Sequence, residues 1–206
     1  DIPGNVVPVI GWLRDMKAGK DVSLGHVAVV GGGNVAMDAA RCAKRMGAEH
    51  VYVLYRRDEE EMPARKEEVH HAKEEGIEFM LLTNPVKVLD DGTGRVGGLE
   101  CVKMRLTAPD ESGRRAPKVV EGSNFTLEVD TVVMSLGTSP NPLIRSTTPG
   151  LETNRKGCLQ VDEETMATSR PGVYAGGDAV TGAATVILAM GAGKKAAEPM
   201  HQYLQE

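Results

Sequence analysis

The stretch that decides the fold is His26-Val27-Ala28-Val29-Val30-Gly31-Gly32-Gly33-Asn34-Val35-Ala36-Met37-Asp38. Val27–Val30 is a continuous apolar run, which is typical of a parallel strand buried on both faces. Three glycines follow this run, and small or apolar residues then recur at helical spacing up to Met46. The stretch therefore predicts a strand, a tight turn and a helix in direct succession.

The glycine turn matches the dinucleotide fingerprint G-x-G-x-x-G/A as Gly31-x-Gly33-x-x-Ala36. In this pattern the first glycine permits the turn, the second lets the backbone approach a pyrophosphate, and the small third residue packs the helix on the strand. Phosphates favour the free N–H groups at a helix N-terminus. We expect the nucleotide site to be lined by Gly31, Gly32, Gly33, Asn34, Val35 and Ala36, together with Gly137 at the end of a later strand.

The residues after the second strand bear on the choice between NAD and NADP. An NAD site favours Asp or Glu about 20 residues past the glycines, where it binds the ribose 2′-hydroxyl. This chain has Tyr55-Arg56-Arg57 there, and a guanidinium can grip a 2′-phosphate. We therefore expect NADP(H) bound through Arg56 and Arg57. An alternative stays open, in which Asp58 binds the ribose and the arginines only balance the acidic run Glu59–Glu61.

The pattern around the turn predicts an α/β fold with a Rossmann-like, doubly wound parallel sheet. Its further strands are expected at 50–55, 77–82 and 131–136, with helices at 34–46 and 62–75. Runs of alternating polarity at 86–89, 99–106 and 125–129 predict a small antiparallel β-meander inserted before the last strand.

A second signature lies near the C-terminus, where Gly172-Val173-Tyr174-Ala175-Gly176-Gly177-Asp178 precedes an apolar helix start at Thr185-Val186-Ile187. A strand, a small-residue turn ending in Asp and a helix are typical of the flavin half of an FAD site. We expect Gly177, Asp178, Thr185, Val186 and Ile187 to contact FAD, with Asp178 on a ribityl hydroxyl. Asp178 could instead be a turn residue or helix cap.

These signatures divide the chain into three parts. A connector at 1–22 includes a short helix at the apolar stretch Val9–Leu13, and an NADP(H)-binding Rossmann domain at 23–140 has its β insertion at about 84–130. The C-terminal part of an incomplete FAD-binding domain follows at 141–206. No second glycine turn precedes the flavin signature. We therefore expect the chain to be part of a longer flavoprotein and to hold no FAD by itself.

The charge and composition of the chain narrow the classes of binding partner and site. The net charge of −5 disfavours nucleic acid, and no apolar run has the length of a membrane span. The N-terminus has no signal-peptide pattern, so we expect a cytoplasmic protein. Cys42, Cys101 and Cys158 are far apart and predict no metal site. Hydride transfer requires no catalytic side chain, because the cofactors supply the chemistry.

The chain resembles the small (β) subunit of NADPH-dependent glutamate synthase, in the family of flavoproteins with two dinucleotide-binding domains. The resemblance is carried by the strings Val29–Asp38, Tyr55-Arg56-Arg57 and Pro171–Asp178. The resemblance implies hydride transfer from NADPH to FAD, and electron transfer through iron–sulfur clusters to a large subunit that forms glutamate. It also implies that Gly31, Gly33, Asn34 and Ala36 line the pyrophosphate.

The sequence also leaves other hypotheses for the function open. Similar strings occur in ferredoxin–NADP reductase and sulfide dehydrogenase subunits, and the isolated chain could be a non-catalytic nucleotide-binding module. The apolar helix start near Val186 could also pair two copies of the chain as a homodimer.

Overall fold

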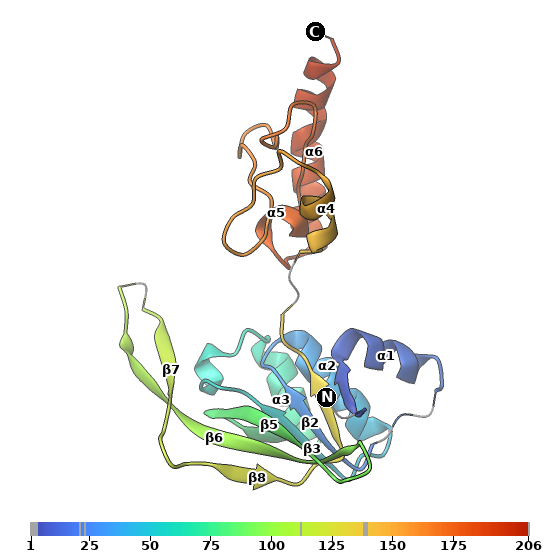
Figure 1. The fold of residues 1–206 in the computed structure, drawn as a ribbon, viewed down its shortest axis with the longest axis vertical. Helices are drawn as coiled ribbons and strands as arrows, with labels where there is room; N and C mark the ends of the chain where they lie inside the picture. Colours follow the sequence, from blue (N-terminus) through green and yellow to red (C-terminus); the bar gives the residue numbers. More distant parts are fainter. Residues whose placement is uncertain (1–3, 21, 23, 112, 138–139, 206) are drawn as a thin grey trace. The chain divides into compact units, whose positions relative to one another are not determined.

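The computed structural model (Figure 1) describes residues 4–20, 22, 24–111, 113–137 and 140–205. The chain divides into unit 1, Asp1–Leu136, and unit 2, Gly137–Glu206. The helices of unit 1 are α1 (Val9–Lys17), α2 (Asn34–Arg45), the 3-10 turn η1 (Glu59–Glu61) and α3 (Lys66–Glu74). Its strands are β1 (Val6–Pro8), β2 (His26–Val30), β3 (His50–Leu54), β4 (Glu78–Met80), β5 (Thr83–Asp90), β6 (Val96–Pro109), β7 (Arg115–Val119), β8 (Phe125–Leu127) and β9 (Thr131–Met134). Unit 2 contains α4 (Pro142–Thr147), α5 (Asp178–Thr181) and α6 (Val186–Tyr203).

A five-stranded parallel sheet forms the centre of unit 1, in the order β1-β9-β2-β3-β4. The apolar run predicted as a buried strand is β2, whose residues Val27–Val30 are all buried. The predicted α/β fold with a parallel sheet is thus confirmed. The order of the strands reverses beside β2, since the chain runs from β2 to β3 and β4 on one side and returns to β9 on the other.

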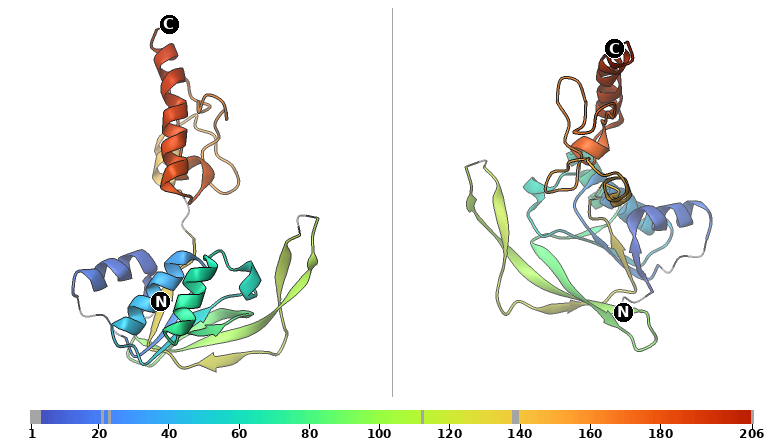
Figure 2. Two further views of the ribbon diagram at one scale, coloured as in Figure 1. Left: turned by 180° about the vertical axis from the view of Figure 1, so that it is seen from behind. Right: turned by 45° about the horizontal axis from the view of Figure 1, so that its top comes forward.

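The direction of each crossover determines which face of the sheet it covers. The steps from β1 to β2, β2 to β3 and β3 to β4 all move the same way across the sheet, so right-handed crossovers place α1, α2 and α3 on one face. Figure 2 (left) shows these helices in front of the sheet. Trp12 of α1, Met37 of α2 and Val69 of α3 share one apolar cluster there.

The return from β4 to β9 moves the opposite way, so its connection covers the opposite face. This connection consists of four strands, in which β5, β7 and β8 each pair antiparallel with β6. β5 and β8 both pair with Leu99–Cys101 and therefore lie on opposite edges of β6. Leu99 and Cys101 pack beneath the parallel sheet with Val30 and Val132 in a second apolar cluster.

Two parts of unit 1 differ from the sequence-based expectation. The expected connector at 1–22 contains an unexpected strand, β1, which pairs with β9. The short helix expected in this segment is α1, which buries Trp12 in the core. The pattern did not indicate a strand because β1 has three residues and ends at Pro8, which an edge strand tolerates. The expected meander also has an additional strand, β7, and its last strand pairs with β6.

Candidate dinucleotide site

Gly31 is the turn residue between β2 and α2. Its φ is +143°, and a Cβ built on it would lie 2.3 Å from the backbone oxygen of Ser135, just past β9. Its N–H donates to the carbonyl of Leu54 at the end of β3, over 3.0 Å. The turn is therefore held between the two strands that flank β2, and glycine is required there by both conformation and space.

Gly32 lies against an aromatic ring. A Cβ on Gly32 would come within 2.7 Å of the Tyr55 ring, and the Tyr55 hydroxyl donates to the carbonyl of Glu61 over 2.8 Å. The carbonyl of Gly32 accepts a hydrogen bond from the N–H of Ala64. The segment from Tyr55 to Ala64 is thus fastened directly to the glycine turn.

Gly33 differs from its two neighbours because the space beside it is open. It is the N-cap of α2, and no heavy atom lies within 4 Å of a Cβ built on it. Asn34 and Val35 are exposed, whereas Ala36 is buried against the core. Within the described part of the chain, no acceptor is found for the N–H groups of Asn34 and Val35. An open helix N-terminus with free N–H groups fits a phosphate.

The two arginines after β3 have different surroundings. Arg56 is exposed, and no ion pair to it is found among the described residues. Arg57 is half-buried, and its guanidinium donates to the backbone carbonyl of Arg115 at the start of β7. The Nε of Arg57 is buried, and no partner for it is found in the described ranges. Arg57 therefore has unused hydrogen-bonding capacity.

The acidic run that follows finds its partners elsewhere. The Asp58 carboxylate caps η1 by accepting from the N–H of Glu59, and Glu59 pairs with Lys73 at 2.6 Å. Glu60 and Glu61 both pair with Arg115. The alternative in which Arg56 and Arg57 balance these carboxylates finds no support in this arrangement. The role of Arg115 could not be predicted from the sequence, because no local pattern points to a residue 54 positions from Glu61.

In unit 2, Gly176 and Gly177 of the predicted flavin signature pack tightly on α6. A Cβ on Gly176 would lie 2.7 Å from the Cβ of Ala192, and one on Gly177 would lie 3.1 Å from that of Ala189. Gly177 also has a φ of +64°, which favours glycine. The predicted strand before this turn is represented by an isolated bridge between Ala167 and Tyr174.

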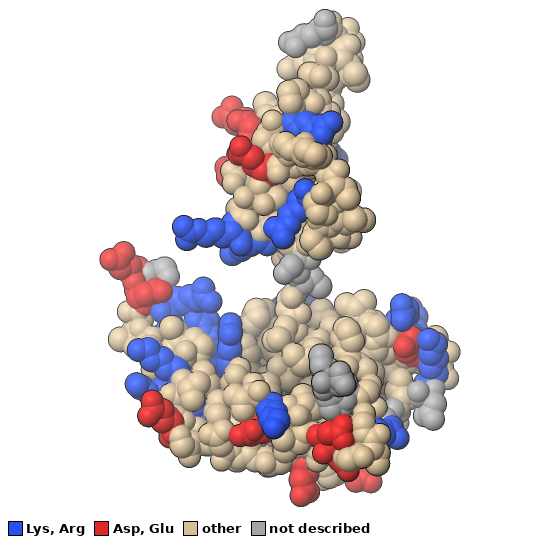
Figure 3. All heavy atoms as spheres, in the orientation of Figure 1, with Lys and Arg blue, Asp and Glu red and all other residues tan. Residues whose placement is uncertain are grey.

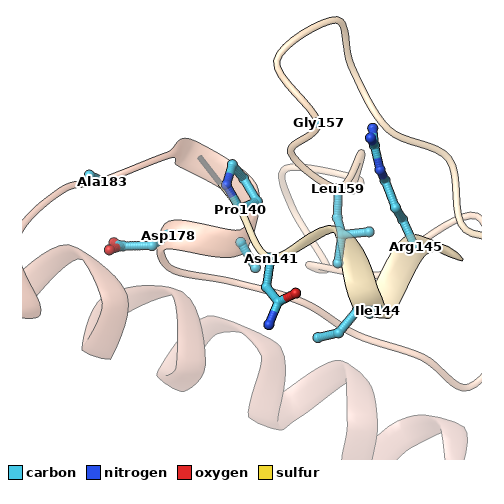
Figure 4. Close-up of a pocket in the computed structure, with 9 residues that line it drawn as sticks. Pro140, Asn141, Ile144, Arg145, Gly157, Leu159, Asp178 and Ala183 are labelled. Atoms are coloured by element: carbon cyan, nitrogen blue, oxygen red, sulfur yellow. The ribbon is translucent and has the colours of Figure 1, made fainter. Parts of the chain in front are cut away.

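The other predicted flavin residues lie at one exposed end of unit 2. Asp178 begins α5 and accepts from the N–H of Ala184 over 3.2 Å, while Thr185 caps α6 by accepting from Leu188. Val186 and Ile187 are 76% and 79% exposed. A hollow of about 270 Å³ beside Asp178 is lined by residues that include Asn141, Ile144 and Leu159 (Figure 4). Gly137 is exposed, and open space lies beside it.

Other classes of site receive no support from the described residues. No group of three or more His, Cys, Asp or Glu side chains there could hold a metal ion. Within those same residues, no helix is long and apolar enough to cross a bilayer.

Comparison with known proteins places this arrangement in a family. The chain is 44% identical to the glutamate synthase [NADPH] small chain of Azospirillum brasilense, over 97% of this chain and 44% of that one. It is 43% identical to the NADP(+)-dependent formate dehydrogenase subunit beta of Moorella thermoacetica, over 98% of this chain and 29% of that one. The chain thus spans less than half the length of these relatives.

The fold also matches solved structures. Mycobacterium tuberculosis FprA in complex with NADPH aligns with a TM-score of 0.74 at 17% identity, covering 100% of this chain and 60% of FprA, which establishes a shared fold. A family model described as pyridine nucleotide-disulphide oxidoreductase matches residues 2–193. The chain therefore belongs to the pyridine nucleotide-disulphide oxidoreductase family.

Proposed function

We propose that this chain is the NADPH-binding portion of a flavoprotein oxidoreductase. In that role the open N-terminus of α2 at Gly33–Val35 would hold the pyrophosphate, and Arg56 and Arg57 would hold the 2′-phosphate. NADPH supplies a hydride and FAD accepts it when both are bound. Residues of unit 2 that include Asp178 and the N-terminal backbone of α6 would hold the ribityl chain and the flavin.

The observation that carries the proposal is the distribution of charge after β3. The carboxylates of Asp58–Glu61 are engaged in a helix cap or in ion pairs with Lys73 and Arg115. Arg56 is exposed, and no ion pair to it is found in the described chain, whereas the guanidinium of Arg57 is half-buried and donates to the carbonyl of Arg115. An unpaired cation next to satisfied carboxylates favours a bound 2′-phosphate over a ribose hydroxyl.

The electron acceptor beyond FAD is proposed from the relatives. The likeness to the glutamate synthase [NADPH] small chain supports electron delivery to a glutamate-forming large subunit through iron–sulfur clusters. The nearly equal likeness to a formate dehydrogenase subunit beta supports a second candidate, in which the same NADP(H) half serves a different partner.

Titration of the purified chain with NADPH and NADH tests the nucleotide assignment. A charge-assisted contact to the 2′-phosphate contributes roughly 1.5–3 kcal/mol, so we expect at least about tenfold tighter binding of NADPH. Arg56→Ala should remove most of this preference by weakening NADPH and leaving NADH nearly unchanged.

Arg95→Ala is the matched control. Arg95 is an exposed arginine in the turn between β5 and β6. This turn lies at the other end of the sheet, because the carbonyl of Gly94 accepts from the N–H of Gly4, just before β1. Equal affinities for NADPH and NADH in the unaltered chain, or equal effects of Arg56→Ala and Arg95→Ala, would refute the assignment.

A further inference from the structure

The antiparallel insertion reaches the segment that carries the two arginines. Arg115, the first residue of β7, donates from its Nε to the Glu61 carboxylate over 2.6 Å and also pairs with Glu60. The side chains of Arg115 and Glu61 are 33% and 14% exposed, so this ion pair is partly shielded from water. An ion pair that is partly shielded from water is screened less by salt and contributes more than a fully exposed one.

Glu61 connects this ion pair to the rest of the segment. Its second carboxylate oxygen accepts from the N–H of Asp58 over 3.2 Å, which closes the capping box of η1. Its backbone carbonyl accepts from the Tyr55 hydroxyl, and the Tyr55 ring lies against Gly32. The contacts of Glu61 therefore link β7 to Tyr55 and Asp58, which flank the two arginines, and through Tyr55 to the glycine turn.

The backbone of β7 also contacts Arg57 directly. The carbonyl of Arg115 accepts from the Arg57 guanidinium, so the side chain of Arg115 fixes the position of an acceptor for Arg57. Figure 3 shows Lys and Arg side chains gathered along the β6–β7 hairpin, at the left of that view. On this hairpin Arg105 and Lys118 are exposed cross-strand partners. The hairpin thus places positive charge near a segment that is expected to bind an anion.

We infer that Arg115 is a positioning residue for 2′-phosphate recognition: its ion pair with Glu61 holds Arg56 and Arg57 where they select NADPH over NADH. This inference rests on the proposed NADPH site. Arg115 itself is occupied by Glu60 and Glu61, so it acts through the segment and not by touching the nucleotide.

The test measures dissociation constants for NADPH and NADH by the fluorescence of the reduced nicotinamide, together with urea unfolding of each variant. Arg115→Ala should weaken NADPH about tenfold and change NADH less than about twofold. Glu61→Gln removes the same ion pair from the other side and should have a similar effect. Arg115→Lys keeps a cation beside Glu61 and should recover most of the preference.

Arg114→Ala is the matched control, because it removes the same charge from the neighbouring, exposed position of the hairpin. Equal weakening of both nucleotides by Arg115→Ala, or an unchanged ratio of their affinities, would overturn the inference while leaving the NADPH site itself intact. An effect of Arg114→Ala as large as that of Arg115→Ala would overturn it in favour of general electrostatic attraction. An unaltered chain that binds NADH as tightly as NADPH would overturn the proposed function and, with it, this inference.

Discussion

Replacing Gly31 by alanine should mainly lower the stability of the fold, whereas replacing Gly33 by alanine should mainly weaken NADPH binding. In Gly31→Ala, the new Cβ would lie 2.3 Å from the carbonyl oxygen of Ser135 and 3.0 Å from its carbonyl carbon, both of which are backbone atoms that cannot rotate away. The φ of +143° adds strain for any residue with a Cβ. In Gly33→Ala, φ is −92° and no heavy atom lies within 4 Å of the new methyl group.

The expected free energies of unfolding follow from these distances. For Gly31→Ala, overpacking costs about 1–3 kcal/mol. A φ that is nearly restricted to glycine costs a further 1–3 kcal/mol or so. The total is a large share of the roughly 5–15 kcal/mol by which a typical domain is stable. Gly33→Ala loses a favourable N-cap residue, which costs about 1 kcal/mol at most.

Urea unfolding and NADPH titration separate the two effects. Gly31→Ala should lower the urea midpoint strongly, whereas Gly33→Ala should unfold almost as the unaltered chain does. Gly33→Ala should nevertheless weaken NADPH at least about tenfold, because the methyl group occupies the space through which a phosphate reaches the α2 N–H groups. An unchanged urea midpoint in Gly31→Ala would refute the structural role of Gly31, and normal NADPH affinity in Gly33→Ala would refute phosphate binding beside Gly33.

Two further predictions concern pH and flavin. Arg45 and Arg41 hold the pKa of Glu75 at about 2 against its usual 4.5, so the stabilisation from Glu75 should be present above about pH 4.5 and be lost as the pH falls toward 2. Glu75→Gln should therefore destabilise the chain at pH 7 and match the unaltered chain near pH 2, and an equal deficit at both pH values in urea unfolding would contradict this. The purified 206-residue chain should be colourless, because its sequence contains no second glycine turn that could hold the FAD pyrophosphate; stoichiometric flavin absorbance would contradict this.

The sequence predicted the parts of the fold whose residues are contiguous. β2, the glycine turn and α2 follow one another, so apolar periodicity and glycine spacing were sufficient to place them. β1 and β7 were missed because each is short and contains proline, at Pro8 and Pro117, and each gains its place from a distant strand. The same reason explains the missed role of Arg115, whose partner Glu61 lies on another element.

The route that the chain takes from β4 back to β9 has a consequence for engineering. In this chain the segment after β3 is braced by a hairpin from the return connection, through Arg115, as well as by its own cap at Asp58. A protein designer who transplants residues 55–61 into another Rossmann scaffold would therefore move the arginines without their brace. A graft that transfers nucleotide preference should therefore also transfer the β6–β7 hairpin, which is separate from residues 55–61 in the sequence.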